Sequence, residues 1–314
     1  MTTIQAILDK YRQKIDRLDL ELLIAHELKK SREFILAHPE ETVDKKQESG
    51  INKLLTKRLE NEPLAYILGQ KEFYGLDFRV TRDTLIPRPE TELLVETAIC
   101  NLPTRQAGME HITCSKNEAI KIIDIGTGSG NIIISIAKTI ASKNLLHACL
   151  SGRQASGYML YGIDISQKAL KIAKYNAKKL GLDKKIKFIH GNLLDPLIGS
   201  WKLEIGNSRM IILANLPYLS KEIYSATAPT VKNFEPKSAL YSPKAGLGHY
   251  EKLLKQIQDL KRHCYVLHIT CFMEFSPEQK KGLTGLVKKI LPSAKIQFKQ
   301  DLAGKWRICM LELI

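Results

Sequence analysis

The stretch at 120–130, Ile-Lys-Ile-Ile-Asp-Ile-Gly-Thr-Gly-Ser-Gly, decides the fold. An apolar run typical of a buried strand enters a loop with glycines at alternate positions, and a helix is predicted to begin near Asn131. These glycines let the backbone turn tightly and approach a ligand without Cβ clashes. The loop does not follow the dinucleotide spacing G-x-G-x-x-G, and it lacks the lysine of a P-loop. Asp124 before the first glycine suits a positively charged sulfonium, so the loop favours S-adenosylmethionine over NAD. The loop residues predicted to hold this cofactor are Asp124, Gly126, Thr127, Gly128, Ser129 and Gly130.

Two later strand ends supply the rest of the predicted cofactor site. Asp164 ends the second strand, where acidic residues accept the hydroxyls of a ribose. It lies farther along the chain than is usual, and a surface insertion at 143–157 explains the excess. After the third strand, Asn192 is predicted to bond the exocyclic amine of adenine and Leu193 to pack on the ring. Asn215, after the fourth strand, is predicted to border the same cofactor.

Strands and helices alternate through the second part of the chain. Candidate strands lie at 120–125, 159–164, 186–189, 209–214, 264–270, 296–300 and 306–312. Helix-length segments separate the first five, which predicts a seven-stranded, mostly parallel, doubly wound sheet. The last two strands are close enough in sequence to form an antiparallel hairpin at the edge of the sheet.

The first part of the chain has a different pattern. Apolar residues recur at helical spacing through 1–70, with Ser31 as a helix start, which predicts a small helical domain. Residues 71–83 alternate around Gly75 and predict a β-hairpin linker. The remaining residues, 84–314, form the second domain, in which a polar loop is expected at 101–118. A helical cap of this kind usually shapes a partner or substrate site, although an inert packing domain is the alternative.

The turn Asn215-Leu216-Pro217-Tyr218 follows the fourth strand and is the predicted catalytic element. The carboxyl end of such a strand lies at the crevice where open α/β sheets bind ligands. A planar NH2 group has two hydrogens, which the Asn215 side-chain oxygen and the Leu216 main-chain carbonyl can accept. Pro217 fixes the local backbone, and Tyr218 offers a ring face to a flat substrate. A simple strand-ending turn is the alternative interpretation.

Composition limits the class of protein. The hydrophobic share of 44% and the charged share of 26% are those of an ordinary globular protein. The net charge of +15 favours an anionic partner, but solvated lysine-rich helices explain it equally well. The six cysteines show no C-x-x-C spacing, so we expect reduced, mostly buried thiols. We expect no metal site, no membrane span, no secretory signal and a cytoplasmic location.

Taken in order, these motifs resemble class I S-adenosylmethionine-dependent methyltransferases that methylate amino groups. Upstream, Glu62-Pro63, Phe73-Tyr74-Gly75 and the stretch Ile86-Pro87-Arg88-Pro89-Glu90-Thr91-Glu92 resemble the signature of the PrmC/HemK family. Downstream, Glu235-Pro236, Glu274 with Gln279, and Asp301-Leu302-Ala303-Gly304-Lys305 also fit. The resemblance covers nearly the whole chain.

The resemblance implies a glutamine N5-methyltransferase whose substrate is the Gly-Gly-Gln loop of peptide chain release factors. It also implies that the helical domain and the 86–92 stretch form the protein-substrate face, although Arg88, Glu90 and Glu92 also suit structural caps and ion pairs. We expect a monomer that needs no direct contact with nucleic acid. The family usually carries Asn-Pro-Pro-Tyr, whereas Leu216 stands here in place of the first proline, and Asn192 stands where an acid is common.

Two other functions fit parts of the sequence. The first is an adenine-N6 methyltransferase acting on RNA or DNA, because the exocyclic NH2 group of adenine offers the same two hydrogens to the turn. The net charge of +15 suits such a substrate. The upstream signature and the lack of an added nucleic-acid module argue against it. A non-catalytic adaptor that docks to translation factors would not need the glycine loop, Asp164 or Asn215.

Overall fold

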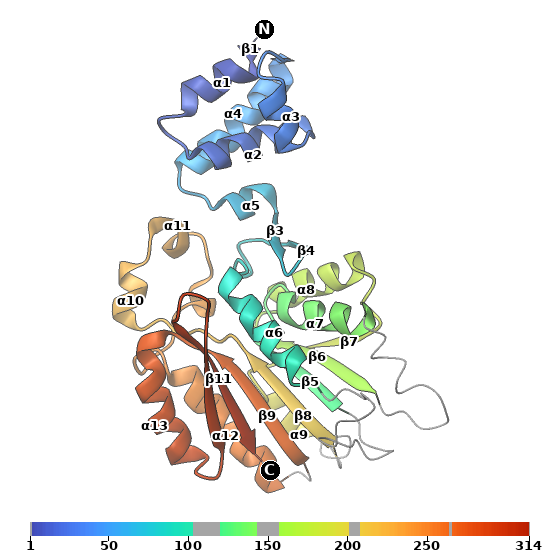
Figure 1. Cartoon of the computed structure of the whole chain (residues 1–314), viewed down its shortest axis with the longest axis vertical. Helices are drawn as coiled ribbons and strands as arrows, with labels where there is room; N and C mark the ends of the chain where they lie inside the picture. Colours follow the sequence, from blue (N-terminus) through green and yellow to red (C-terminus); the bar gives the residue numbers. More distant parts are fainter. Residues whose placement is uncertain (1, 103–119, 143–156, 201–207, 264–265, 314) are drawn as a thin grey trace. The chain divides into compact units, whose positions relative to one another are not determined.

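The computed structural model describes residues 2–102, 120–142, 157–200, 208–263 and 266–313. The chain divides into two compact units (Figure 1): Met1–Lys71 with Thr227–Phe234, and Glu72–Ala226 with Glu235–Ile314. The predicted polar loop at 101–118 and the predicted insertion at 143–157 lie, except at their ends, outside the described residues.

The first unit is helical around a small apolar core. Its elements are β1 (Thr2–Thr3), α1 (Ile4–Tyr11), α2 (Arg17–Leu28), α3 (Arg32–Ala37), β2 (Thr42–Val43), α4 (Lys45–Leu59), α5 (Leu64–Leu68) and α11 (Pro229–Lys232). Polar side chains cap four helices by accepting backbone N–H groups: Thr3, Asp16, Ser31 and Asp44. The predicted helix start at Ser31 is thereby confirmed. Apolar residues at helical spacing, such as Leu20, Leu23, Ile24 and Ile51, are at most 1% exposed and form the core.

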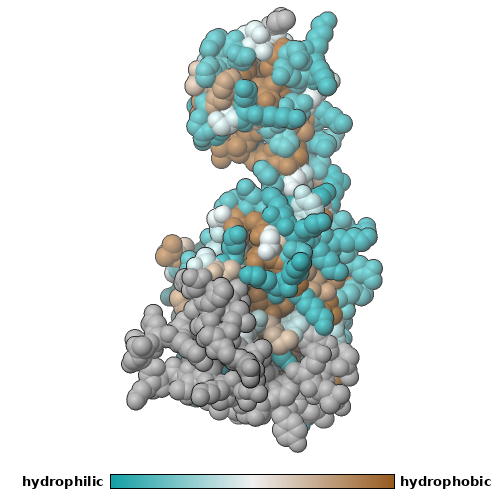
Figure 2. All heavy atoms as spheres, turned by 90° about the vertical axis from the view of Figure 1, so that its right-hand side faces the viewer, coloured by the Kyte–Doolittle hydropathy of each residue, from teal (hydrophilic) through white to brown (hydrophobic). Residues whose placement is uncertain are grey.

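The surface of the first unit is not uniformly polar. Figure 2 shows hydrophilic side chains around its outline and an apolar area on the face toward the viewer. Large apolar side chains are partly exposed in this unit, among them Leu18, Leu36 and Leu59.

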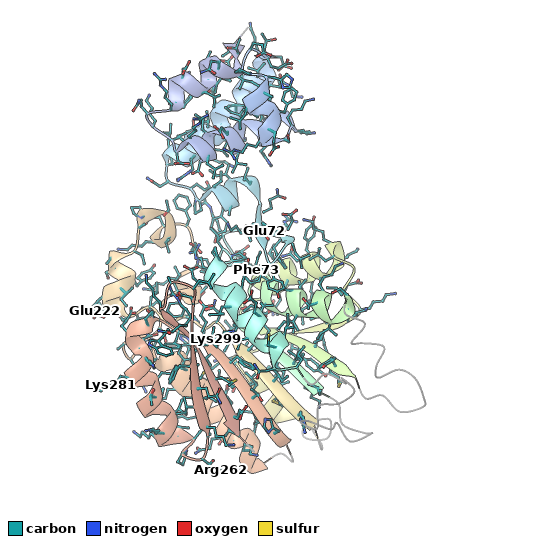
Figure 3. All side chains as sticks on the ribbon, in the orientation of Figure 1. Glu72, Phe73, Glu222, Arg262, Lys281 and Lys299 are labelled. Atoms are coloured by element: carbon teal, nitrogen blue, oxygen red, sulfur yellow. The ribbon has the colours of Figure 1, made fainter. Side chains whose placement is uncertain are left out.

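A β-hairpin of β3 (Gln70–Phe73) and β4 (Leu76–Arg79) follows, as predicted. Tyr74 and Gly75 both have positive φ, at 54° and 70°, which is the backbone of a two-residue hairpin turn. Phe73, labelled in Figure 3, and Phe78 are buried and anchor the hairpin.

The second unit contains a seven-stranded sheet in the order β10-β11-β9-β8-β5-β6-β7. Its strands are β5 (Ile120–Ile125), β6 (Tyr158–Asp164), β7 (Ile186–His190), β8 (Ser208–Ala214), β9 (Val266–Glu274), β10 (Lys295–Gln300) and β11 (Trp306–Leu313). The five strands from β9 to β7 are parallel, and β11 is antiparallel to both β9 and β10. The predicted mostly parallel, doubly wound sheet with a helical region and a hairpin before it is confirmed.

Helices cover both faces of the sheet (Figure 1). The helices are α6 (Glu92–Cys100), α7 (Asn131–Ser142), α8 (Gln167–Lys179), α9 (Asp195–Ser200), α10 (Lys221–Ala226), α12 (Gly248–His263) and α13 (Lys280–Ile290), with short 3-10 turns η1 (Pro89–Thr91), η3 (Lys237–Ala239) and η4 (Pro277–Gln279). Alternate residues of β5 separate the two cores. Ile122 packs with α6, α7 and α8, and Ile123 packs with α9, α12 and α13. This alternation decides in which of the two cores a side chain near the end of β5 is buried.

The predicted antiparallel hairpin of the last two strands is confirmed: β10 and β11 pair at the edge of the sheet, with β10 outermost and β11 against β9. Two predictions need correction. The fifth strand continues to Glu274 instead of ending at 270, because the apolar run Cys271-Phe272-Met273 pairs fully with β11. Thr227–Phe234 groups with the first unit, although it lies inside the predicted second domain at 84–314. The spacing of apolar residues predicts helices and strands, but it does not predict which unit a segment joins. Of the cysteines, Cys271 and Cys309 are buried and Cys100 is exposed, while Cys114, Cys149 and Cys264 lie outside the described residues.

Candidate active site

An open-sided cavity lies at the carboxyl ends of the parallel strands and contains about 780 Å³ of empty space. Residues from every predicted part of the site contribute to it: Gly126, Gly128, Asp164, Asn192, Leu193, Asn215, Leu216 and Pro217. Further wall residues were not assigned to the site from the sequence: Asp83, Thr84, Leu85, Ile165, Ser166, Ala169, Pro236, Ser238, Ala239 and His249. Gly191, beside the predicted adenine contacts, also lines the cavity. A cavity in this position, at the carboxyl ends of parallel strands, suits a small organic cofactor.

The glycine loop has the backbone that its sequence predicts. Gly126, Gly128 and Gly130 have φ of 72°, 55° and 83°, a region that residues with a Cβ rarely adopt. Only Gly126 and Gly128 line the cavity. A Cβ at Gly130 would lie 2.8 Å from Cδ1 of Ile134, so this glycine serves close packing of the loop on α7.

Asp124 has a different place from the one its position suggested. It is fully buried, does not line the cavity, and accepts a 2.6 Å hydrogen bond from the Thr127 hydroxyl. Burial raises the pKa of Asp124 to about 7. Thr127 and Ser129 are also buried behind the cavity wall. Asp124 points from the same face of β5 as Ile122, which packs on α7, and not into the cavity at the end of the strand. Asp124, Thr127 and Ser129 therefore support the shape of the loop from its buried side.

Asp164 lies where it can hold a ribose. Its carboxylate oxygens accept hydrogen bonds from the Gly128 N–H, at 2.9 Å, and from the Ser166 N–H, at 2.8 Å. Each oxygen keeps a further lone pair, so the carboxylate can also accept two hydroxyls. Burial raises the pKa of Asp164, and these backbone hydrogen bonds oppose the shift. Ile165, next in sequence, is 62% exposed at the cavity and offers an apolar contact to a ring.

Gln256 on α12 fixes the backbone at the predicted adenine contacts. Its side-chain oxygen accepts from the Leu194 N–H at 3.0 Å, and its amide lies 3.4 Å from the Asn192 carbonyl and 2.5 Å from Asp195 Oδ1. Leu193 has a positive φ of 55°, a strained conformation that these bonds support. No local sequence signal points to Gln256, since it lies far along the chain.

The turn after β8 lies between two cavities. A second, smaller cavity has about 330 Å³ of empty space and is lined by Leu85, Arg88, Asn215, Leu216, Tyr218, Leu219, Ala239 and Leu240. Leu85, Asn215, Leu216 and Ala239 line both cavities. Asn215 and Leu216 therefore lie on the wall that separates the glycine-loop side from the side that contains Tyr218.

Three residues of the turn have a defined hydrogen-bond partner. Asn215 Nδ2 donates to Thr91 Oγ1 at 3.0 Å, and the Tyr250 hydroxyl lies 3.4 Å from the Leu216 carbonyl oxygen. The Tyr218 carbonyl accepts from Gln279 Nε2 at 2.8 Å. Burial raises the pKa of Tyr218, and the charge of Glu274 adds to the rise. The phenol therefore stays protonated at neutral pH.

Arg88 forms an ion pair of the kind expected for a structural role. Arg88 donates to the buried carboxylate of Glu235, whose other oxygen accepts from the Ile86 N–H at 3.1 Å. This pairing ties the 85–88 segment, which lines both cavities, to the 235–240 segment opposite. Glu92 accepts from the Tyr74 N–H at 2.9 Å and ties the hairpin to α6.

These features fit S-adenosylmethionine. Gly126 and Gly128 leave space beside the cavity for a ligand, and Asp164 offers acceptors for the two hydroxyls of a ribose. Asn192 and Leu193, the predicted adenine contacts, line the same cavity. The sheet order and this cavity define a class I S-adenosylmethionine-dependent methyltransferase.

The comparisons with known proteins give the family. Residues 2–69 match the PrmC N-terminal domain, and residues 116–223 match a methyltransferase domain. The release factor glutamine methyltransferase of Bacillus anthracis is 30% identical over 293 residues, which are 93% of this chain and 91% of that protein. The protein of the same name from Nitratidesulfovibrio vulgaris is 31% identical over 310 residues, 96% of this chain and 92% of that protein. The chain therefore belongs to the release factor glutamine methyltransferase family.

Among solved structures, the chain is similar to the human Mettl16 catalytic domain in complex with the MAT2A 3'UTR hairpin 1. It shares 16% identity over 79% of this chain and 77% of that chain, with a TM-score of 0.47. This likeness is too remote to bear on the substrate.

Proposed function

We propose that this protein transfers a methyl group to the side-chain amide nitrogen of the glutamine in the Gly-Gly-Gln loop of peptide chain release factors. One observation carries the proposal: Asn215 and Leu216 lie on a wall shared by a cofactor-sized cavity and a smaller cavity that contains Tyr218. Membership of the release factor glutamine methyltransferase family supports this choice of substrate.

The chain's own residues would bind and orient the amide. S-adenosylmethionine would be held by Gly126, Gly128, Asp164, Asn192 and Leu193. When bound, it would supply an electrophilic methyl group, whose bond to sulfur breaks as the bond to the amide nitrogen forms and leaves a neutral thioether.

An amide nitrogen is a poor nucleophile because its lone pair is delocalised into the carbonyl. Asn215 Oδ1 and the Leu216 carbonyl accept the two amide hydrogens and hold the nitrogen in a near-attack geometry. Pro217 restricts the backbone of the turn, and Tyr218 forms the wall of the substrate cavity.

The same two acceptors stabilise the transition state. The nitrogen gains positive charge as the new C–N bond forms. Asn215 Oδ1 and the Leu216 carbonyl oxygen carry partial negative charge, so they bind the transition state more tightly than the ground state. The cationic nitrogen then releases a proton readily, so a strong general base is not required.

We further propose that residues 1–70 recognise the release factor, and that the 71–83 hairpin joins them to the methyltransferase domain at 84–314. The partly exposed leucines of the first unit support a protein-binding role. We expect a cytoplasmic monomer that needs no direct nucleic-acid contact. Among the described residues, no helix is long and apolar enough to cross a membrane, and no cluster of three or more metal-ligating side chains is found.

A side-by-side methyl-transfer assay tests this function. The purified chain is incubated with labelled S-adenosylmethionine and with a release factor, the same factor with its Gly-Gly-Gln glutamine changed to alanine, or ribosomal RNA. We expect label on the unchanged release factor only, and one added methyl on that glutamine by mass spectrometry. Label on the RNA alone would establish the adenine methyltransferase instead. Failure to bind cofactor in calorimetry would favour the adaptor.

A further inference from the structure

The end of the turn at 215–218 is held by a buried side chain that lines neither cavity. Gln279 is the last residue of η4, between β9 and α13, and is 6% exposed. Its Nε2 donates to the Tyr218 main-chain carbonyl at 2.8 Å and to the Ala245 main-chain carbonyl at 3.0 Å. Its Oε1 accepts from the Ser276 N–H at 3.2 Å. One amide thus joins the turn to two other segments of the chain.

These hydrogen bonds use both ends of the Gln279 amide. Its NH2 group has two hydrogens, one for each of the two carbonyls, and its oxygen takes the Ser276 N–H. Turning the amide over would break all three bonds and would place an oxygen against two carbonyl oxygens. A carboxylate in the same place has no hydrogen to donate. The position therefore requires an amide and does not suit an acid of the same shape.

Gly246 packs against the same two groups. It has a φ of 85°, and a Cβ there would lie 2.0 Å from the Tyr218 carbonyl oxygen and 2.2 Å from Gln279 Nε2. The two preceding residues, Lys244 and Ala245, also have positive φ, at 56° and 53°, which is an unfavourable backbone for residues with a Cβ. The hydrogen bond from Gln279 to Ala245 supports this conformation. Gly246 and Gln279 together leave the Tyr218 carbonyl little room to move.

The next residue ties the turn to the opposite side of the smaller cavity. The Leu219 N–H donates to the Leu240 carbonyl at 2.9 Å, and the Leu219 carbonyl accepts from the Ser242 N–H at 3.0 Å. Tyr218, Leu219 and Leu240 all line that cavity. A shift of the Tyr218 main chain would therefore change the shape of the space in which the glutamine side chain would bind.

We propose that Gln279 is a positioning residue that acts through the Tyr218 main chain to fix the shape of the smaller cavity. The inference rests on the proposed function, because it assigns that cavity to the substrate. Gln279 touches neither substrate nor cofactor in this role. It acts from the segment after β9 on the turn after β8, the neighbouring strand of the sheet.

The first pair of variants changes glutamines. Gln279→Glu keeps the shape of the side chain and removes both donors; Lys281, two residues farther along the chain, is labelled in Figure 3. Gln258→Glu is the matched control. Gln258 on α12 is another partly buried glutamine whose Nε2 donates to a main-chain carbonyl, that of Ile290 at 2.6 Å, and neither residue lines the two cavities.

The second pair changes glycines. Gly246→Ala puts a methyl group against the Tyr218 carbonyl and the Gln279 amide. Gly181→Ala is the matched control, because Gly181 has a similar φ of 73°. An added Cβ there would meet no heavy atom of the described residues within 4 Å apart from its chain neighbours. Both substitutions therefore strain the backbone, and only the first disturbs the turn.

The measurements are kcat and KM for the release factor, and the cofactor Kd with the number of cofactor sites by calorimetry. We expect Gln279→Glu and Gly246→Ala to lower kcat per cofactor site by about 10- to 100-fold, as misplacement of a reacting group does. KM should change less than kcat, because misplacement acts on the near-attack geometry more than on binding. Cofactor Kd should stay within about threefold, since Tyr218 does not line the cofactor cavity.

The controls separate positioning from a general loss of stability. A residue that only stabilises the fold would lower the number of cofactor sites and leave kcat per site unchanged. Gln258→Glu and Gly181→Ala should therefore keep kcat per site within about twofold of wild type, even where they make the protein easier to unfold in denaturant.

The outcomes also separate the inference from the function on which it depends. A wild-type chain that methylates no release factor refutes the function. An active wild type with an equally active Gln279→Glu variant refutes the inference, as does a Gln258→Glu variant that loses as much kcat per site as Gln279→Glu. If Gln279→Glu does not fold, Gln279→Met, which removes the hydrogen bonds without adding a charge, takes its place, and the comparison of Gly246→Ala with Gly181→Ala still decides.

Discussion

Two buried carboxyl groups lie at the ends of the strands on either side of β8, and their residues are held in different ways. Asp124 is the last residue but one of β5 and Glu274 is the last residue of β9, and burial raises the pKa of each to about 7. Asp124 accepts from Thr127, three residues away in its own loop. The main-chain carbonyl of Glu274 accepts from the hydroxyl of Tyr250, which comes from α12. The support of the glycine loop by Asp124 is thus local in sequence, whereas Asn215 on the acceptor side bonds Thr91, 124 residues away in the chain.

The largest expected effect comes from removing the acceptor oxygen itself. Asn215→Ala should lower kcat by about 10²–10³-fold, the usual loss when one preorganised hydrogen-bond partner of a transition state is removed. Cofactor Kd should change by less than about threefold, because Asn215 is only one of many residues that line the cofactor cavity. Single-turnover kinetics and calorimetry measure the two quantities.

Asp164→Asn, on the cofactor side, should change the same two quantities in the opposite way to Asn215→Ala. It should weaken cofactor binding while kcat at saturating cofactor stays within about threefold. If Asn215→Ala raised cofactor Kd as much as Asp164→Asn does, the division into a cofactor side and an acceptor side would be wrong.

The two buried acids should also make stability depend on pH. The unfolded chain releases their protons near pH 4, whereas the folded protein keeps them until about pH 7. The folded state therefore binds more protons over this range, and the free energy of unfolding falls as pH rises, by roughly 3 kcal/mol for each group. Denaturant unfolding of wild type, Asp124→Asn and Glu274→Gln between pH 5 and 8 measures this slope.

Each amide variant should show a flatter slope than wild type. The comparison must be made between proteins, because His249 and His268 have lowered pKa values and act in the opposite direction over part of the same range. Equal slopes in all three proteins would mean that neither acid keeps its proton in the folded state.

The smallest effect on activity is expected for Leu216→Pro. The role proposed for this residue belongs to its main-chain carbonyl, so kcat should stay within about threefold in the methyl-transfer assay. Stability should fall by about 1 kcal/mol, because the leucine side chain is 2% exposed and packs in the core. A loss of kcat comparable to that of Asn215→Ala would show that the leucine side chain shapes the site.

Local chemistry explains what the sequence could predict. Glycines at Gly126 and Gly128, the strand-end acid Asp164 and the turn at Asn215 are readable because each is set by the residues beside it in the chain. The contacts of Gln256 with the 192–195 segment and of Glu235 with Ile86 and Arg88 were not predicted, since these partners are far away in sequence. The predicted position of Asp124 was wrong. Side chains alternate between the two faces of a strand, and this alternation, not the closeness of Asp124 to the loop, decides where its carboxyl group lies.

The wall that the two cavities share has a consequence for inhibitor design. Leu85, Asn215, Leu216 and Ala239 border both spaces, so a single compound that passes this wall would occupy both at once. Its adenosine-like half would bind as it does to many methyltransferases. Its other half, built as an amide that reaches Tyr218 and Leu240, would provide selectivity for this family.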